Sequence, residues 1–92
     1  MIRSFKHKGL RRYFSDGVQS GIQSAHAEKL KLILGWLGSA VAPKDMNLPG
    51  LNLHQLRGDR KGTWSVWING NWRVTFSFEG KDAKDVDYED YH

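Results

Sequence analysis

Cysteine is absent from this 92-residue chain, which excludes disulfide bonds, thiolate metal sites and a cysteine nucleophile. Long hydrophobic runs are absent as well: the longest uncharged stretch, residues 32–43, contains two glycines and ends in a proline. A membrane-spanning helix needs roughly 17–25 apolar residues, and the first residues do not begin an apolar signal segment. We therefore expect a soluble cytoplasmic protein without membrane association.

Acidic residues are scarce over most of the chain. Residues 1–73 contain twelve Lys and Arg against four Asp and Glu, whereas residues 74–92 contain two Lys and Arg against six Asp and Glu. The net charge of the whole chain is +4. A basic body attracts a polyanion such as nucleic acid, and an acidic end opposes that attraction unless its carboxylates have a specific task. A mixed, solvated surface with a basic bias is the alternative interpretation.

The chain is long enough for one hydrophobic core, so residues 1–92 are predicted to form a single domain. Apolar residues spaced three and four apart predict a helix over residues 6–16, with Gly17 as its cap. The same spacing predicts a second helix that Ser24 caps, with an apolar stripe from Ala27 to Leu37, and that Gly38 ends.

Two apolar residues, Leu32 and Trp36, lie off the apolar stripe of the second helix. They indicate a second contact surface on this helix. The first helix is expected to cover it, and a partner protein is the alternative.

The periodicity changes after the loop predicted at residues 39–50, because apolar residues then alternate as they do in strands. The predicted strands are a short opening segment at residues 2–5 and segments around residues 51–54, 63–68, 72–78 and 86–88. An Asn-Gly pair at residues 69–70 predicts a type I′ hairpin turn. The predicted fold class is α+β, with two N-terminal helices packed on one face of a small antiparallel sheet.

The alternation also predicts which polar side chains lie on the open face of the sheet. Four large apolar side chains of residues 72–78 would face the helices, which places Arg73 on the other face. His54 is out of phase with Leu51 and Leu53, so it is expected to face outward too. The alternatives are an ion pair between Arg73 and a carboxylate on a neighbouring strand, and a purely structural His54.

A basic turn follows His54. Arg57, Arg60 and Lys61 cluster around two glycines, which is typical of a phosphate-contacting turn, although the turn lacks the spacing of the known nucleotide-binding motifs. The four histidines do not have the spacing of metal ligands, so we expect no metal site and no cofactor.

The chain ends in Tyr88-Glu89-Asp90-Tyr91-His92, a concentration of groups used in acid–base chemistry near neutral pH. A solvated tail with a chance histidine is the alternative. If the substrate is RNA, its 2′-hydroxyl can attack the adjacent phosphate, provided that one group removes a proton, another protonates the leaving oxygen and a cation binds the phosphate oxygens. The side chains that supply these group types are His54, Arg57, Arg73, Asp90, Tyr91 and His92.

Five segments, in this order, carry a resemblance to a known superfamily. They are residues 2–10 (IRSFKHKGL), 53–60 (LHQLRGDR), 64–69 (WSVxIN), 71–76 (NWRVxF) and 88–92 (YEDYH). The chain resembles, over essentially its whole length, the RelE/ParE superfamily of bacterial toxins and within it the HigB-type toxins. It departs from related toxins at Arg57, where lysine is frequent, and at Lys84, where an apolar residue is frequent.

The resemblance implies a RelE-like fold and a ribosome-dependent endoribonuclease. We expect the reaction to need no metal, because the nucleophile is part of the RNA. Such a toxin cuts mRNA in the ribosomal A site and stops translation. The resemblance also implies a HigA-type helix-turn-helix antitoxin, and contact with operator DNA only through the toxin–antitoxin complex.

By position, the resemblance assigns the active site to His54, Asp90, Tyr91 and His92, with Arg73 as the phosphate-binding arginine. We expect His92 and His54 to share the acid–base work, Asp90 to orient His92, and Tyr91 to position the RNA. The basic residues expected to dock ribosomal RNA or phosphate are Lys6, Lys8, Arg11, Arg12, Arg57, Arg60 and Lys61.

Two other functions stay open at this point. A ParE-like gyrase inhibitor would bind a protein and cut no RNA, and it would have no use for two acid–base histidines. A non-catalytic nucleic-acid-binding module would need exposed aromatic side chains or a recognition helix, and the alternation buries most of the aromatic residues.

Overall fold

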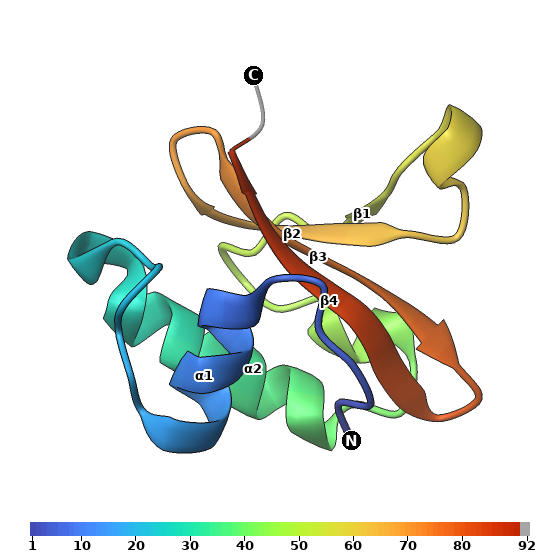
Figure 1. Cartoon of the computed structure of the whole chain (residues 1–92). Helices are drawn as coiled ribbons and strands as arrows, with labels where there is room; N and C mark the ends of the chain where they lie inside the picture. Colours follow the sequence, from blue (N-terminus) through green and yellow to red (C-terminus); the bar gives the residue numbers. More distant parts are fainter. Residues whose placement is uncertain (91–92) are drawn as a thin grey trace.

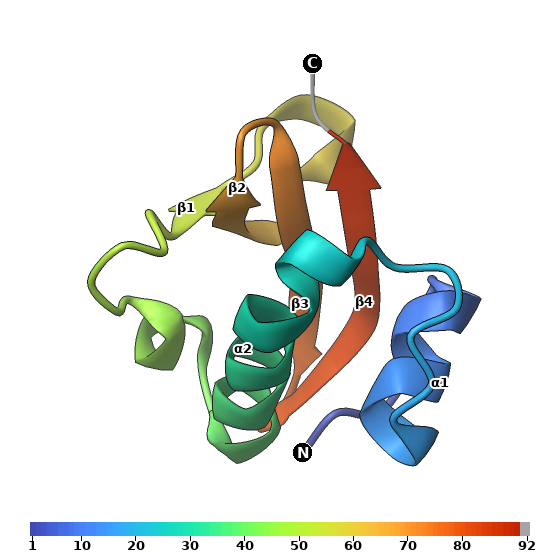
Figure 2. The same cartoon turned by 90° about the vertical axis from the view of Figure 1, so that its left-hand side faces the viewer.

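A four-stranded antiparallel sheet forms the centre of the molecule. The computed structural model describes residues 1–90. The strands are β1 (His54–Gln55), β2 (Trp64–Asn69), β3 (Trp72–Glu79) and β4 (Asp82–Asp90), and they lie in the order β1-β2-β3-β4. Helix α2 (Ala27–Ser39) crosses one face of the sheet, and helix α1 (Lys8–Asp16) lies beside β4 (Figures 1 and 2). The predicted α+β class is confirmed.

Three short 3-10 helices complete the secondary structure of residues 1–90. They are η1 (Ser24–His26), η2 (Pro43–Met46) and η3 (Gly58–Arg60). No helix of the described chain is long and apolar enough to cross a membrane.

Helix α1 begins and ends through local hydrogen bonds. His7 has an extended backbone, and its Nδ1 accepts a hydrogen bond from the amide of Leu10 at 3.0 Å. A residue that caps a helix lies outside it, so the predicted start at residue 6 was two residues too early. Gly17 adopts the left-handed conformation (φ 73°) and donates its amide to the carbonyl of Tyr13, as predicted for a glycine cap.

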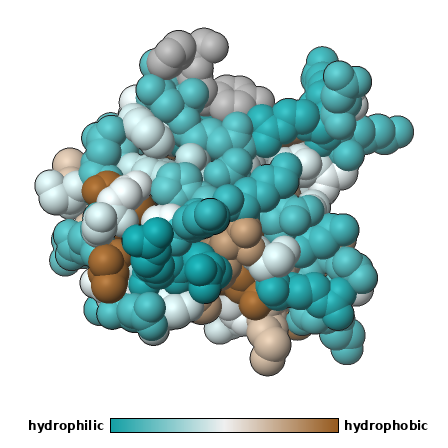
Figure 3. All heavy atoms as spheres, viewed as in Figure 1, coloured by the Kyte–Doolittle hydropathy of each residue, from teal (hydrophilic) through white to brown (hydrophobic). Residues whose placement is uncertain are grey.

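Helix α2 departs from the prediction at both ends. It follows the 3-10 turn Ser24–His26 and continues through Gly38 to Ser39, so Gly38 does not end it. Leu32 and Trp36 are 52% and 42% exposed, so the expectation that α1 covers them is wrong. Most of the surface in Figure 3 is hydrophilic, with apolar patches over the helical side and the lower part of the view.

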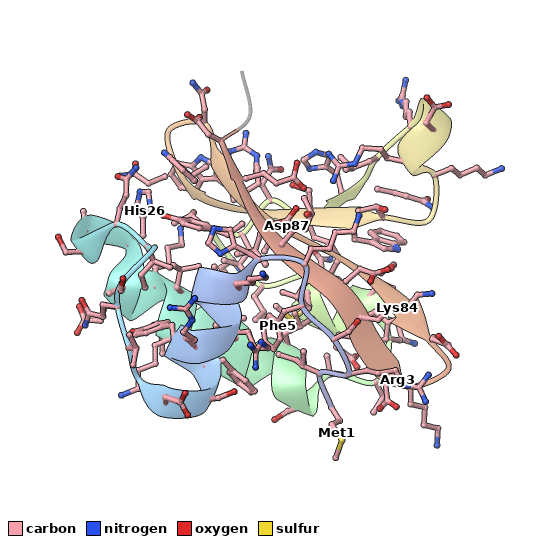
Figure 4. The ribbon with its side chains drawn as sticks, in the orientation of Figure 1. Met1, Arg3, Phe5, His26, Lys84 and Asp87 are labelled. Carbon is pink, nitrogen blue, oxygen red and sulfur yellow. The ribbon has the colours of Figure 1, made fainter. Side chains whose placement is uncertain are left out.

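The N-terminal segment pairs with the edge of the sheet without forming a strand. Ile2 and Phe5 make isolated parallel bridges to Ala83 and Val86 of β4. The side chain of Arg3, labelled in Figure 4, lies near the β3–β4 turn and pairs with Glu79 at 2.8 Å. The predicted strand at residues 2–5 is thus reduced to two bridges on β4.

Two of the predicted strand features are displaced. Asn69 pairs with Trp72, so the hairpin loop is Gly70-Asn71, and of these two only Gly70 has a positive φ, at 55°. A type I′ turn requires positive φ at both loop residues, so the predicted Asn69-Gly70 turn is wrong. The strand predicted at residues 51–54 fails because Asn52 adopts φ 49°, which interrupts an extended backbone.

The alternation of β3 is confirmed, and it sets the two faces of the sheet. Val74 and Phe76 are fully buried against the helices, and Arg73 has the opposite phase. Ser65 and Thr75 share the phase of Arg73 yet are 0% and 1% exposed. Side chains must therefore cover part of the face that the helices leave open.

Two glycines in helices give opposite predictions for stability. A Cβ at Gly35 meets nothing within 4 Å, so Gly35→Ala is expected to stabilise the fold by up to about 1 kcal/mol. A Cβ at Gly9 would lie 3.2 Å from the Cα of Gly21 and 3.0 Å from the His7 ring, so Gly9→Ala is expected to destabilise by about 1–3 kcal/mol. Urea unfolding measures both changes, and equal stabilisation by both would contradict this packing.

Candidate active site

Strand pairing brings the predicted residues of β1 and β3 to one face. His54 pairs with Ser65, which pairs with Thr75, and Arg73 pairs with Trp67 in the adjacent row. Directly paired residues share a face, so His54 and Arg73 both lie on the open face as predicted. One strand separates them, so their backbones lie about 10 Å apart across the sheet and are offset by two residues along it.

The ring of His54 is oriented by the backbone just before β1. Its Nδ1 lies 3.0 Å from the carbonyl oxygen of Asn52, and the residue is exposed. A carbonyl only accepts hydrogen bonds, so Nδ1 carries the proton of the neutral ring and Nε2 keeps its lone pair. The positive φ of Asn52 places this carbonyl, so the feature that ended the predicted strand also orients the imidazole.

Arg73 bonds to the backbone at the end of the β2–β3 hairpin. Its Nη1 donates to the carbonyls of Gly70 at 3.1 Å and Trp72 at 3.2 Å. Within residues 1–90 no carboxylate forms an ion pair with it, although Glu89 lies directly opposite on β4. The bonds of the described chain use one nitrogen of a group that has five N–H donors, which leaves donors for a phosphate.

The carboxylate of Glu89 is bound to other partners on the same face. Arg60 reaches it with both terminal nitrogens, one of them at 2.9 Å, and Thr75 donates its hydroxyl to the same carboxylate. The hydrogen bond from Arg60 is the main cause that lowers the pKa of Glu89, against the effect of burial, and the charge of Lys6 contributes. This cluster covers the buried Thr75.

Sequence reasoning did not include Glu89 among the site residues. The available signal was phase: with Tyr88 in the core, Glu89 had to lie on the open face beside Arg73. The partner of Glu89 could not be inferred, because Arg60 lies in an irregular turn, where sequence spacing does not predict the direction of a side chain.

The basic turn carries its remaining cations at the rim of the sheet. Arg57 precedes the short helix η3, and Gly58 follows with φ 68°, a conformation that favours glycine. Arg57, Gly58 and Lys61 line a hollow of about 400 Å³ with the end of β1. Arg57 and Lys61 are exposed, so two cationic side chains border a surface depression.

The other predicted cations lie at the N-terminal side. Lys6 is close enough to Glu89 to help lower its pKa. Lys8, Arg11 and Arg12 are exposed on or next to the first turns of α1, beside β4 (Figure 2). The predicted docking residues therefore form two groups, one at the basic turn and one along α1.

The end of β4 rests on a buried aromatic cluster. The hydroxyl of Tyr88 lies 2.5 Å from Nδ1 of His26, and the ring of Trp72 packs on Tyr88 with centroids 4.5 Å apart. His26, at the start of the α2 region (Figure 4), is 4% exposed, and burial raises the pKa of Tyr88. These residues hold the strand end, with His26 and Tyr88 buried and Trp72 partly buried, a role that the sequence did not reveal.

Asp90 is the last residue described. It is exposed, at the end of β4, and pairs with Trp72 beside the hairpin that carries Arg73. Tyr91 and His92 lie outside the described residues, so their predicted roles stay predictions. Within residues 1–90, no three side chains of the His, Asp or Glu type form a metal-binding group.

Comparison with known proteins points to one family. A family model described as the RelE-like toxin HigB of type II toxin–antitoxin systems matches residues 3–92. The Proteus vulgaris protein named Endoribonuclease HigB is 42% identical over 92 residues, which is 100% of both chains. The match therefore includes the basic turn, the Arg73 strand and the final residues.

Proposed function

The chain belongs to the RelE-like HigB toxins of type II toxin–antitoxin systems and is an endoribonuclease, and from this premise we propose that it cuts mRNA in the ribosomal A site. The observation that carries the proposal is the open sheet face, which holds an imidazole and a guanidinium; within residues 1–90 neither the imidazole Nε2 nor most of the guanidinium donors are used. These are a proton acceptor and a phosphate-binding cation on one exposed surface.

The reaction uses the nucleophile of the substrate itself. His54 takes the proton of a ribose 2′-hydroxyl at Nε2, the 2′-oxygen bonds to the adjacent phosphorus, and the bond from phosphorus to the 5′-oxygen breaks. The leaving 5′-oxygen receives a proton from His92, which Asp90 orients. The products are a 2′,3′-cyclic phosphate and a 5′-hydroxyl end.

Two further groups act on the RNA in this scheme. Arg73 binds the non-bridging phosphate oxygens and stabilises the charge that grows on them as the 2′-oxygen attacks. Tyr91 positions the RNA. Because the attacking group is part of the RNA, no metal is needed to generate a nucleophile.

Docking on the ribosome relies on the exposed cations. We assign it to Arg57 and Lys61 at the basic turn and to the four basic residues Lys6, Lys8, Arg11 and Arg12. Binding through such phosphate contacts falls steeply with salt concentration. The toxin would then act in the cytoplasm, where translating ribosomes are found.

A type II toxin has a protein antitoxin as its partner. We propose a HigA-type helix-turn-helix antitoxin for this chain. Operator DNA would be bound through the antitoxin, so the toxin reaches it only within the complex.

The test is cleavage on programmed ribosomes. Purified protein is incubated with ribosomes stalled on a defined mRNA, and the ends are mapped and analysed chemically. New ends that carry a 2′,3′-cyclic phosphate within the A-site codon are expected, and far fewer on the same mRNA without ribosomes. Intact mRNA would overturn the proposal; inhibition of gyrase supercoiling would then identify the ParE-like class, and bound but uncut mRNA a binding module.

A further inference from the structure

We propose that Arg60 is a positioning residue that keeps Glu89 away from Arg73, so that the Arg73 guanidinium stays available for an RNA phosphate. This inference rests on the proposed function, in which Arg73 binds phosphate. It replaces the sequence prediction that Arg60 itself contacts RNA.

The register of the sheet makes Glu89 the natural ion-pair partner of Arg73. The two residues are directly paired across β3 and β4 and share the open face. Side chains at such positions have Cβ atoms about 4.5–5.5 Å apart, and opposite charges there attract. Nevertheless, Arg73 donates to the carbonyls of Gly70 and Trp72 while Glu89 bonds elsewhere.

Arg60 and Thr75 together account for the orientation of Glu89. Arg60 binds both carboxylate oxygens, and Thr75 adds a third hydrogen bond to one of them. The Glu89 side chain is 22% exposed, so solvent screens this pair less than a fully exposed one. Arg60 is the largest influence that lowers the pKa of Glu89, and Arg73 is not among the influences.

Removal of Arg60 would leave Glu89 with the hydrogen bond of the Thr75 hydroxyl and the weaker influence of the Lys6 charge. A cross-strand pair with Arg73 would then be favoured, because Arg73 is the cation directly opposite Glu89. An internal carboxylate on Arg73 competes with the phosphate, because each binding event excludes the other. Given the usual strength of cross-strand charge pairs, this competition would weaken the apparent affinity for RNA by up to about five-fold.

The first experiment compares cleavage kinetics of wild type, Arg60→Met, Glu89→Gln and the double variant. Methionine keeps an apolar stem of similar length, and glutamine keeps hydrogen-bonding atoms while it loses the charge. Arg60→Met is expected to raise KM on programmed ribosomes about five-fold with kcat nearly unchanged, since saturating RNA displaces the carboxylate. The double variant is expected to return to within about two-fold of the Glu89→Gln value of KM.

The four variants form a cycle that separates the proposal from simple electrostatics. Removal of one negative charge improves RNA binding in any background. The proposal therefore requires that Glu89→Gln lowers KM by a larger factor in the Arg60→Met background than in wild type. If Arg60 binds RNA directly, loss of Arg60 raises KM by the same factor whether residue 89 is Glu or Gln, so KM of the double variant stays well above that of Glu89→Gln. That result would overturn the proposal while it leaves the nuclease function intact.

A matched control pair lies at the other end of the sheet. Arg3 binds Glu79 at 2.8 Å beside the β3–β4 turn, outside the proposed site. Arg3→Met also loses an Arg–Glu ion pair, a more exposed one, and is expected to leave KM unchanged. Thermal unfolding of each variant shows whether it is folded at the assay temperature.

A second readout does not depend on nuclease activity. The side-chain Nε–H resonance of Arg73, assigned by NMR, is expected to shift and to exchange more slowly with water in Arg60→Met, and to revert in the double variant. An unchanged Arg73 resonance in a folded Arg60→Met protein would overturn the proposal. If the wild type cuts no mRNA but the resonance responds as expected, the proposed function fails and the positioning role of Arg60 stands.

Discussion

Arg73→Ala is expected to slow mRNA cleavage by about 10²–10³-fold at saturating ribosomes, the largest loss on the open face together with that of His54. The guanidinium would bind phosphate oxygens whose charge increases between the bound RNA and the transition state. An interaction that strengthens in this way lowers kcat when it is lost. Arg73→Lys is expected to recover only part of the rate, because an ammonium cannot place two parallel donors on one phosphate.

A control must separate this chemistry from the support that Arg73 gives to the hairpin. Trp67 also donates a hydrogen bond to the carbonyl of Gly70, at 2.9 Å, and carries no charge. Trp67→Phe removes that bond and is expected to keep cleavage within a few-fold of wild type. If Arg73→Ala were as active as Trp67→Phe in single-turnover assays, Arg73 would have no part in the chemistry.

The elements that the sequence predicted well are those with a regular period. The alternation of β3 put Val74 and Phe76 in the core and Arg73 on the other face, because side-chain direction in a strand reverses at every residue. The glycine cap of α1 was predictable for a different, local reason: Gly17 fits a left-handed backbone position at low cost.

The errors share a different cause, which is competition between local signals and tertiary contacts. Asn69-Gly70 is a strong turn signal, yet Asn69 pairs in the sheet and a bulge after Trp67 moves the loop by one residue. Gly38 is tolerated within α2 despite its low helix propensity, and propensity is a weak guide once a helix packs on a core.

The sequence predicted which side of the sheet carries the candidate site, but not the hydrogen bonds and ion pairs between its residues. Phase and the family resemblance together indicated that His54 and Arg73 lie on one side of the sheet. The ion pair of Arg60 with Glu89 joins residues 29 positions apart through a turn without periodicity, so no pattern in the sequence indicates it. The orientation of the His54 ring also depends on a single backbone carbonyl, at Asn52.

His54→Ala is expected to lower the cleavage rate by about 10²–10⁴-fold, the usual contribution of a positioned acid–base group. The hydrogen bond from Nδ1 to Asn52 supports a role as proton acceptor, because it leaves the lone pair on Nε2 facing solvent. Gln55→Ala, at the next position of β1, is a matched control and is expected to cut at nearly the wild-type rate.

Added imidazole gives this prediction its sharpest test. The exposed position of His54 leaves room for a free imidazole in the alanine variant, so millimolar imidazole is expected to restore part of the rate in proportion to its neutral form. Rescue of His54→Ala but not of Arg73→Ala would assign proton removal to position 54. A slow His54→Ala variant that imidazole does not restore would instead indicate that the ring orients the RNA, and an undiminished rate would remove His54 from the mechanism.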